Sequence, residues 1–292
     1  MLSGKPLTHN AETAVILRDL ARQSGLKTAY AASFQFAASV QHAKRLVENG
    51  AIGEPTEVES ISHFNLERGI PFGWSHRAED GGGRLNNNFT HSLAIVNAVI
   101  GDDILAICGD VRDDLHEAPI VDGVHDFTQR RNFIPKDLND PNLDWGQSNV
   151  EWSYTVMARV RSPLAKQSVS VLFKHGGLAP RFGDEHIVFY GTKGAIHLQG
   201  HYGTGTLSHQ DGSSWRDIAL PADIANAIPQ VKGETEQCWH ILAQRFVDDI
   251  LGKNVEPYPS FEHGCHYQQI IDAVRNFEGW IDHSMINRRG VL

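Results

Sequence analysis

Apolar positions near the N-terminus follow helical spacing first and strand spacing next. Val15, Leu17 and Leu20 predict an amphipathic helix that ends at Gly25, and residues 27–34 predict a short strand. A single β–α unit of this kind cannot bury both faces of a parallel sheet. The pattern therefore predicts that further strands, upstream or on a partner chain, complete the unit.

The middle of the chain alternates helical and strand-like stretches. Three consecutive glycines, Gly81–Gly83, lead into the second of two predicted helices. Residues 115–149 show no periodicity, and so long a loop in a compact domain is usually functional or mobile. The predicted helices span residues 37–49 and 90–100, and the predicted strands span 56–64 and 104–111.

A closely spaced series of strand-like runs begins at residue 150. Their short connections favour antiparallel pairing. Two helices are predicted at the end, over residues 234–251 and 261–283, and the second carries a stripe from Tyr267 to Ile281. The predicted strands span residues 151–161, 166–174, 185–190, 195–199, 205–209 and 214–218.

Composition narrows the class of protein. The 292 residues are 41% hydrophobic and carry a net charge of -9, which argues against a broad nucleic-acid surface. The sequence contains neither a secretory pattern nor an uninterrupted apolar run long enough to span a membrane. Cys108, Cys238 and Cys265 do not form a disulfide framework, so we expect a cytoplasmic protein.

The strongest local signal for chemistry runs from Gly81 to His91. Glycines let the backbone approach a ligand closely, and the N–H groups at a helix start favour an anionic or oxyanionic ligand. Asn87 and His91 are spaced to share one helix face, where imidazole exchanges a proton and an amide orients a hydroxyl. The alternative is a glycine turn, an Asn-rich cap and one partly buried histidine.

Lys5 is a second candidate because it precedes Pro6 at a strand-to-helix turn, where open α/β sheets bind ligands. A solvated surface lysine is the alternative. His63, Arg68 and Trp74 follow a predicted strand and could line a sugar pocket, or could simply pack on the domain.

Two other motifs give weaker evidence for a functional site. His263, Cys265 and His266 match no standard zinc spacing, so we expect no metal site. Residues 191–194 suggest a phosphate loop, but they lie between two strand-like runs and predict a hairpin turn.

Several motifs together, in order, resemble the glucose–fructose oxidoreductase / inositol dehydrogenase / MocA (Gfo/Idh/MocA) family. The resemblance covers essentially the whole chain. The motifs are Lys5-Pro6-Leu7-Thr8, Phe34-Gln35-Phe36, residues 46–53, Gly81–Gly83 leading to His91, residues 190–196 and residues 259–264.

The resemblance implies a fold and a reaction. It implies an α/β chain in which a remnant of a Rossmann domain (residues 1–34) precedes a C-terminal α+β domain (residues 35–292) with an open, mostly antiparallel sheet covered by helices. That domain would bind substrate and form a homodimer or homotetramer. The reaction would be hydride transfer between NAD or NADP and a sugar, polyol or related substrate.

The resemblance also implies roles for individual residues. Lys5 and Pro6 would lie near the nicotinamide, and Lys5, Asn87 and His91 would be catalytic, with His91 the proton donor or acceptor. Asn88 joins His63, Arg68 and Trp74 as a weaker substrate-binding candidate.

Three positions depart from the family pattern. This chain has Gly4 where the family has a glutamate, Asn87 where it has an aspartate and Gln35 where an arginine is usual. The dinucleotide-binding glycine motif is not found in the sequence, so we expect weak NAD(P) binding by this chain. These departures leave a rival hypothesis open, in which the chain is a non-catalytic sugar-binding or oligomerisation module, or a subunit completed by a separate Rossmann chain.

Overall fold

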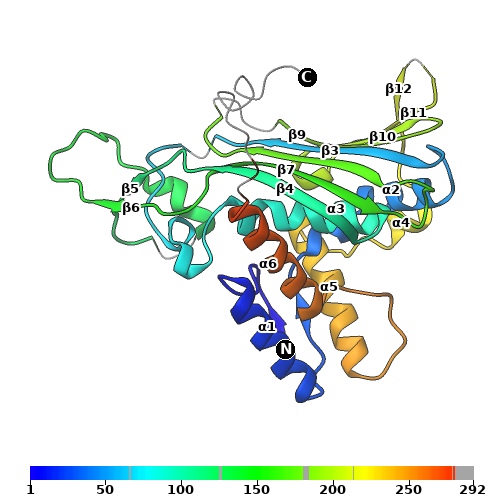
Figure 1. Ribbon diagram of the computed structural model, residues 1–292, viewed down its shortest axis with the longest axis horizontal. Helices are drawn as coiled ribbons and strands as arrows, with labels where there is room; N and C mark the ends of the chain where they lie inside the picture. The colour runs from blue at the N-terminus through cyan, green and yellow to red at the C-terminus, as the bar shows by residue number, and fades with distance from the viewer. Residues whose placement is uncertain (66, 125–126, 180–183, 213, 278, 280–292) are drawn as a thin grey trace, which may run out of the picture.

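An eight-stranded sheet dominates the computed structural model, which describes residues 1–65, 67–124, 127–179, 184–212, 214–277 and 279 (Figure 1). The strand order is β12-β11-β10-β9-β3-β8-β7-β4, and only β3 and β8 pair in parallel. The predicted mostly antiparallel sheet is therefore confirmed. Its strands are β3 (Pro55–His63), β4 (Asp103–Arg112), β7 (Ser153–Arg161), β8 (Val169–Gly176), β9 (Asp184–Gly191), β10 (Ala195–Gln199), β11 (Leu207–Gln210) and β12 (Trp215–Asp217).

Helices cover one face of this sheet. In β7, Tyr154, Val156 and Ala158 are buried, whereas Met157 is 55% exposed, as alternation along a half-covered strand requires. The labelled helices in Figure 1 all lie on one side of the sheet. They are α1 (Ala11–Gln23), α2 (Ala38–Glu48), α3 (Thr90–Ile100), α4 (Ala222–Asn226), α5 (Glu234–Ile250) and α6 (Phe261–Arg275).

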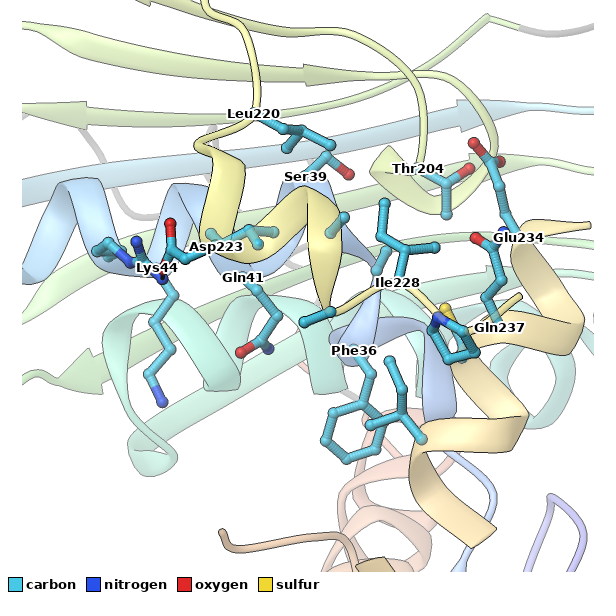
Figure 2. Close-up of a pocket in the computed structure, with 18 of the residues that line it drawn as sticks. Phe36, Ser39, Gln41, Lys44, Thr204, Leu220, Asp223, Ile228, Glu234 and Gln237 are labelled. Atoms are coloured by element: carbon cyan, nitrogen blue, oxygen red, sulfur yellow. Dashed lines mark ion pairs between the residues drawn. The ribbon is translucent and has the colours of Figure 1, made fainter. Parts of the chain in front are cut away.

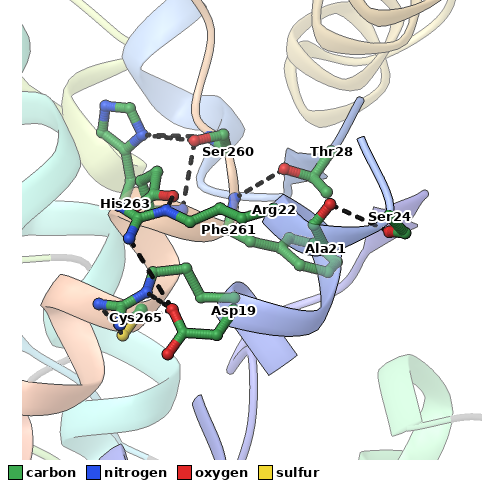
Figure 3. A network of polar contacts seen from close by, with 11 residues as sticks. Asp19, Ala21, Arg22, Ser24, Thr28, Ser260, Phe261, His263 and Cys265 are labelled. Carbon is green, nitrogen blue, oxygen red and sulfur yellow. Dashed lines mark hydrogen bonds and ion pairs between the residues drawn. The ribbon is translucent and has the colours of Figure 1, made fainter. Parts of the chain in front are cut away.

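The N-terminal unit is held against α6. Its strands β1 (Leu2–Ser3) and β2 (Ala29–Tyr30) pair in parallel, with α1 between them in the chain. Arg22 on α1 forms an ion pair with Glu262, and Arg18 donates to Cys265 Sγ at 3.5 Å (Figure 3). Asp272 accepts a hydrogen bond from the first backbone N–H of α1. These contacts fix where the turn after β1 lies.

Some predicted elements differ from the structure. The strand predicted over residues 27–34 shortens to β2, because the chain turns at Ser33–Phe36 into a 3₁₀ helix. The predicted irregular segment contains a small two-stranded antiparallel sheet of β5 (Glu117–Pro119) and β6 (Trp145–Gln147), and a 3₁₀ stretch over Phe127–Phe133. Helix α4 was not predicted, and the last residues predicted for the final helix lie outside the described part of the chain.

No helix among the described residues is long and apolar enough to cross a membrane.

The three glycines before the second helix serve packing within the protein. A Cβ on Gly81 would lie 2.8 Å from Pro6 Cγ, and one on Gly83 would overlap the carboxylate of Glu151. Gly83 has a φ of +94°, a backbone conformation that side chains other than hydrogen rarely adopt. The glycines were predicted to let a ligand approach the backbone closely. At these two positions Pro6 and Glu151 lie there instead.

Replacing Gly83 tests how tightly this turn is packed. We expect Gly83→Ala to lower the free energy of unfolding by about 2 kcal/mol, because it adds backbone strain and displaces Glu151. Gly50→Ala is the matched control, since Gly50 has a φ of +77° but no neighbour within 4 Å of an added Cβ. Equal losses for both variants in urea unfolding would show that packing against Glu151 contributes nothing.

Candidate active site

A π-helical turn over Leu85–Phe89 precedes α3 and shapes the candidate site. Such turns are rare and occur frequently at functional sites. Asn87 is half-buried, Asn88 is fully buried, and His91 lies in the first turn of α3. The turn thus brings both asparagines next to the histidine.

Lys5 reaches this turn from the N-terminal unit. Its Nζ donates a hydrogen bond to the backbone oxygen of Asn87 at 2.7 Å. Burial, and secondly the positive charge of Arg84, lower the pKa of Lys5 to about 7. Lys5, Asn87 and His91, the three residues predicted to be catalytic, therefore lie together.

His91 is buried between aromatic rings. Its ring centroid lies 4.7 Å from that of Phe34 and 4.7 Å from that of Tyr202, and its side chain is 7% exposed. Burial, followed by the charges of Lys5, His201 and Arg84, lowers the pKa of His91 well below its usual range. The imidazole is therefore neutral at neutral pH, and its Nδ1 is buried without a hydrogen-bond partner.

Asn88 anchors a buried polar network under His91. Its Oδ1 accepts hydrogen bonds from Tyr154 and Ser62, and its Nδ2 donates to the hydroxyl of Tyr202 at 3.1 Å. The side chain is 0% exposed. Direct contact with a substrate, as expected from the sequence, does not fit a buried amide whose oxygen and nitrogen are both hydrogen-bonded within the chain; the amide instead bonds Tyr202, whose ring lies against His91.

The same network continues to Arg84. Arg84 Nε donates to His175 Nε2 at 2.9 Å, so His175 carries its proton on Nδ1 and donates to Ser62 Oγ at 2.7 Å. Burial and the charge of Arg84 lower the pKa of His175 well below its usual range, which agrees with a neutral ring. Ser62 then donates to Asn88, and every step has one defined direction.

The backbone at the helix start does not bind an anion as predicted. The N–H of Arg84 donates to the Glu151 carbonyl, and that of Leu85 donates to Glu151 Oε1 at 2.9 Å. Glu151 also pairs with Arg275 of α6 at 3.0 Å. The prediction that these N–H groups serve a ligand was wrong, because a buried carboxylate of the chain already occupies that position.

The weaker candidates are more dispersed. His63 is half-buried at the end of β3 and contributes, after burial and Arg84, to lowering the pKa of His175, so it lies beside the network. Trp74 is half-buried in a 3₁₀ turn over Trp74–His76. Arg68 is exposed, and its charge acts on Asp114.

Sequence reasoning missed several residues of the site. Arg84, His175 and Tyr202 come from three distant segments, and none belongs to a spacing pattern. Tyr202 has a φ of +50° and stacks on Phe34, and the neighbouring His201 pairs with Glu185 at 2.9 Å. Of these residues, only Arg84 could have been suspected from the sequence, because it directly follows the three glycines.

A separate cavity of about 640 Å³ lies between the start of α2, α4 and α5 (Figure 2). Its lining includes Phe36, Ser39, Thr204, Gln237 and Cys238. Lys5, Arg84 and His91 do not line this cavity. It therefore lies apart from the candidate active site.

His263 and Cys265 of α6 have structural roles. His263 Nδ1 accepts a hydrogen bond from the backbone of Ser260 at the helix start, and Cys265 contacts Arg18 (Figure 3). Within the part of the chain that the structure describes, no three His, Cys, Asp or Glu side chains gather as metal ligands.

Comparison with known families identifies the fold. A family model described as the GFO/IDH/MocA C-terminal domain matches residues 40–197, which is more than half of the chain. The chain belongs to the Gfo/Idh/MocA family. No curated protein matches the sequence.

Solved structures of this fold include a dehydrogenase bound to NADH, an NAD binding oxidoreductase and a repressor. Levoglucosan dehydrogenase in complex with NADH and L-sorbose is 18% identical, with a TM-score of 0.74 over 94% of this chain and 70% of that one. An NAD binding oxidoreductase from Klebsiella pneumoniae is 17% identical, with a TM-score of 0.72 over 99% and 72%. A super-repressor mutant of Gal80p from Saccharomyces cerevisiae is 16% identical, with a TM-score of 0.71 over 94% and 69%.

The network under His91 is testable through Asn88. We expect Asn88→Ala to lower the free energy of unfolding by roughly 2–3 kcal/mol, because it leaves the hydroxyls of Tyr154 and Tyr202 buried without this partner. Asn142→Ala is the control, since Asn142 is exposed. A loss no larger than that of the control in thermal or urea unfolding would contradict this network.

Proposed function

We propose that this chain carries the substrate-binding and proton-transfer centre of an NAD(P)-dependent oxidoreductase acting on a hydroxyl or carbonyl group of a sugar, polyol or related compound. The observation that carries the proposal is the meeting of Lys5, Asn87 and His91 from two distant segments, with Lys5 Nζ 2.7 Å from the Asn87 carbonyl. Membership of the Gfo/Idh/MocA family and the NADH-bound neighbours of the same fold support it.

Lys5 is the proposed acid–base group. A pKa of about 7 lets it exchange a proton near neutral pH, which is the range where acid–base catalysis is most efficient. In the oxidation direction, neutral Lys5 accepts the hydroxyl proton of the substrate. His91, neutral over the same range, orients that hydroxyl, and the amide of Asn87 holds a neighbouring one.

The described residues fit only one end of a dinucleotide. In this proposal Lys5 and Pro6 lie beside the nicotinamide, whereas the N–H groups of the glycine turn are already bonded within the chain and are not available to the phosphates. When bound, NAD or NADP would supply the hydride acceptor or donor. We further propose that residues 1–34 belong to the nucleotide-binding side and residues 35–292 to the catalytic side.

His63 and Trp74 are proposed to border the substrate, because both are half-buried and His63 lies beside the network of His175. Arg68, which is exposed, would contact only a longer substrate. The sugars named for solved neighbours, levoglucosan and L-sorbose, agree with a carbohydrate-sized ligand. A cytoplasmic location is part of the proposal, since Cys108, Cys238 and Cys265 are all free thiols.

Substitution of Lys5 tests the acid–base role. We expect Lys5→Met to lower kcat at least about 100-fold in oxidation assays with NAD⁺ or NADP⁺ at high concentration, because proton acceptance is lost. The wild-type oxidation rate should rise with pH and level off above about pH 7, since Lys5 accepts a proton only when neutral.

Lys232→Met serves as the control for that experiment, because Lys232 is exposed and far along the chain from the site. His91→Asn should also reduce kcat while leaving the pH at which the rate levels off unchanged. Full activity of Lys5→Met, or a pH profile that it shares with the wild type, would overturn the assignment.

A second candidate function is non-catalytic. Asn87 cannot exchange a proton as a carboxylate does, and a repressor shares the fold. On the N-terminal unit, Leu2, Ile16 and Leu20 are exposed apolar residues, a surface on which a separate Rossmann chain could pack. Sugar binding without hydride transfer, at any cofactor concentration, would favour this candidate; activity only with a Rossmann chain present would favour completion in trans.

The open face of the sheet predicts self-association. Met157 and Leu105 are exposed there, and the described helices all cover the opposite face. We expect light scattering to give the mass of a homodimer or homotetramer, and Met157→Glu to shift it towards the monomer. Arg159→Glu on the same strand face is a comparison that changes charge without removing an apolar side chain. A monomeric wild-type mass would contradict the prediction.

A further inference from the structure

Arg84 is an unusually buried cation. It directly follows the glycine turn, and its side chain is 6% exposed. Its guanidinium lies over the ring of Phe64, 5.1 Å from the centroid, and its Nε donates to His175. Its Nη2 is buried and makes no hydrogen bond. An arginine at such depth is normally paired with a carboxylate, because burying an unpaired charge is costly.

No such carboxylate is close. In the described part of the chain, neither Arg84 nor Lys5 forms an ion pair, and Lys5 bonds only a backbone carbonyl. Glu185 and Glu151 act on Arg84 at longer range, but each already has a basic partner, His201 for Glu185 and Arg275 for Glu151. Arg84 therefore lacks a direct carboxylate partner in the described part of the chain, and its buried Nη2 is left without a hydrogen bond.

A series of contacting rings links Arg84 to the proposed catalytic residues. The ring of Phe64 lies 5.9 Å from His201, His201 lies 4.4 Å from Tyr202, and Tyr202 lies 4.7 Å from His91. The charge of Arg84 also lowers the pKa of both Lys5 and His91. A molecule whose hydroxyl lies at Lys5 and His91 therefore comes within reach of Arg84.

We propose that the substrate of this site is a sugar acid, whose carboxylate binds Arg84 while a hydroxyl of the same molecule reacts at Lys5 and His91. This inference rests on the proposed function, because it takes the substrate to lie at Lys5 and His91. Beyond that function, it states that the substrate is negatively charged and that Arg84 is the residue that recognises this charge.

The donors available favour a carboxylate over a phosphate. Phosphate sites commonly use free backbone N–H groups at a helix start. Here the N–H groups of Gly82, Gly83 and Arg84 donate to carbonyls of the chain, and that of Leu85 donates to Glu151. A single planar guanidinium matches the two oxygens of a carboxylate.

Calorimetric titration of the wild-type chain tests the substrate charge without any variant. The probes are D-galacturonate, D-glucuronate and D-gluconate, each compared with its neutral parent, D-galactose, D-glucose or D-glucitol. We expect at least one acid to bind about tenfold or more tightly than its parent, which is the range of one charge-assisted contact. The methyl esters of the two uronates should bind like the neutral sugars.

Variants then show which residue is responsible for the preference for acids over neutral sugars. Arg84→Met should abolish it and Arg84→Lys should retain it in part, whereas Arg112→Met, at an exposed arginine on β4, should leave it intact. Circular dichroism and thermal unfolding establish that each variant folds. Equal binding of every acid and its parent by the wild type, a preference that survives in folded Arg84→Met, or tighter binding of glucose 6-phosphate than of any acid would overturn the inference.

Failure of this inference differs from failure of the proposed function. Oxidation of neutral sugars that depends on Lys5, without any preference for acids, would overturn only the role of Arg84. Binding of acids that depends on Arg84, without hydride transfer, would support the inference and overturn the proposed activity.

Discussion

One buried carboxylate holds the candidate site together. Glu151 accepts the N–H of Leu85, pairs with Arg275 of α6 and fills the space that Gly83 leaves open. It thereby joins the glycine turn, the start of β7 and the C-terminal helix at one point. Helix α1 is also bonded to α6. The position of Lys5 relative to His91 therefore depends indirectly on the same carboxylate.

Lys5 and His91 show how one environment gives two groups different roles. Burial and nearby positive charge lower the pKa of both. Because a lysine starts from a higher pKa, the same forces bring it to about 7 and take the histidine out of the physiological range. This difference is the reason why the proposed function gives proton transfer to the lysine and orientation of the hydroxyl to the histidine that the sequence presents as the proton carrier.

The sequence predicts most of the helices and strands. It also singles out Lys5, Asn87 and His91, which the structure brings together, but it does not predict the residues around them. Alternating apolar residues define the strands because each strand is half-buried, and the glycine run marks the start of the site. The partners of Asn88 and Arg84 follow no spacing, since Ser62, His175 and Tyr202 meet them only through the pairing of distant strands. The sequence also could not show that Glu151 occupies the backbone N–H groups at the turn, because a carboxylate so distant in the chain is indistinguishable from a solvated one.

The place of β3 in the sheet has a consequence for how the chain folds. This strand, formed early in the sequence, is flanked by β8 in parallel and β9 in antiparallel orientation, both more than 100 residues later. One edge of β3 can be paired only after the chain has been made as far as Gly176, and the other only after Gly191. Through most of synthesis this strand therefore has both edges unpaired, and the closure of its long loops makes its pairing slow and leaves those edges open to pairing with other chains in the meantime.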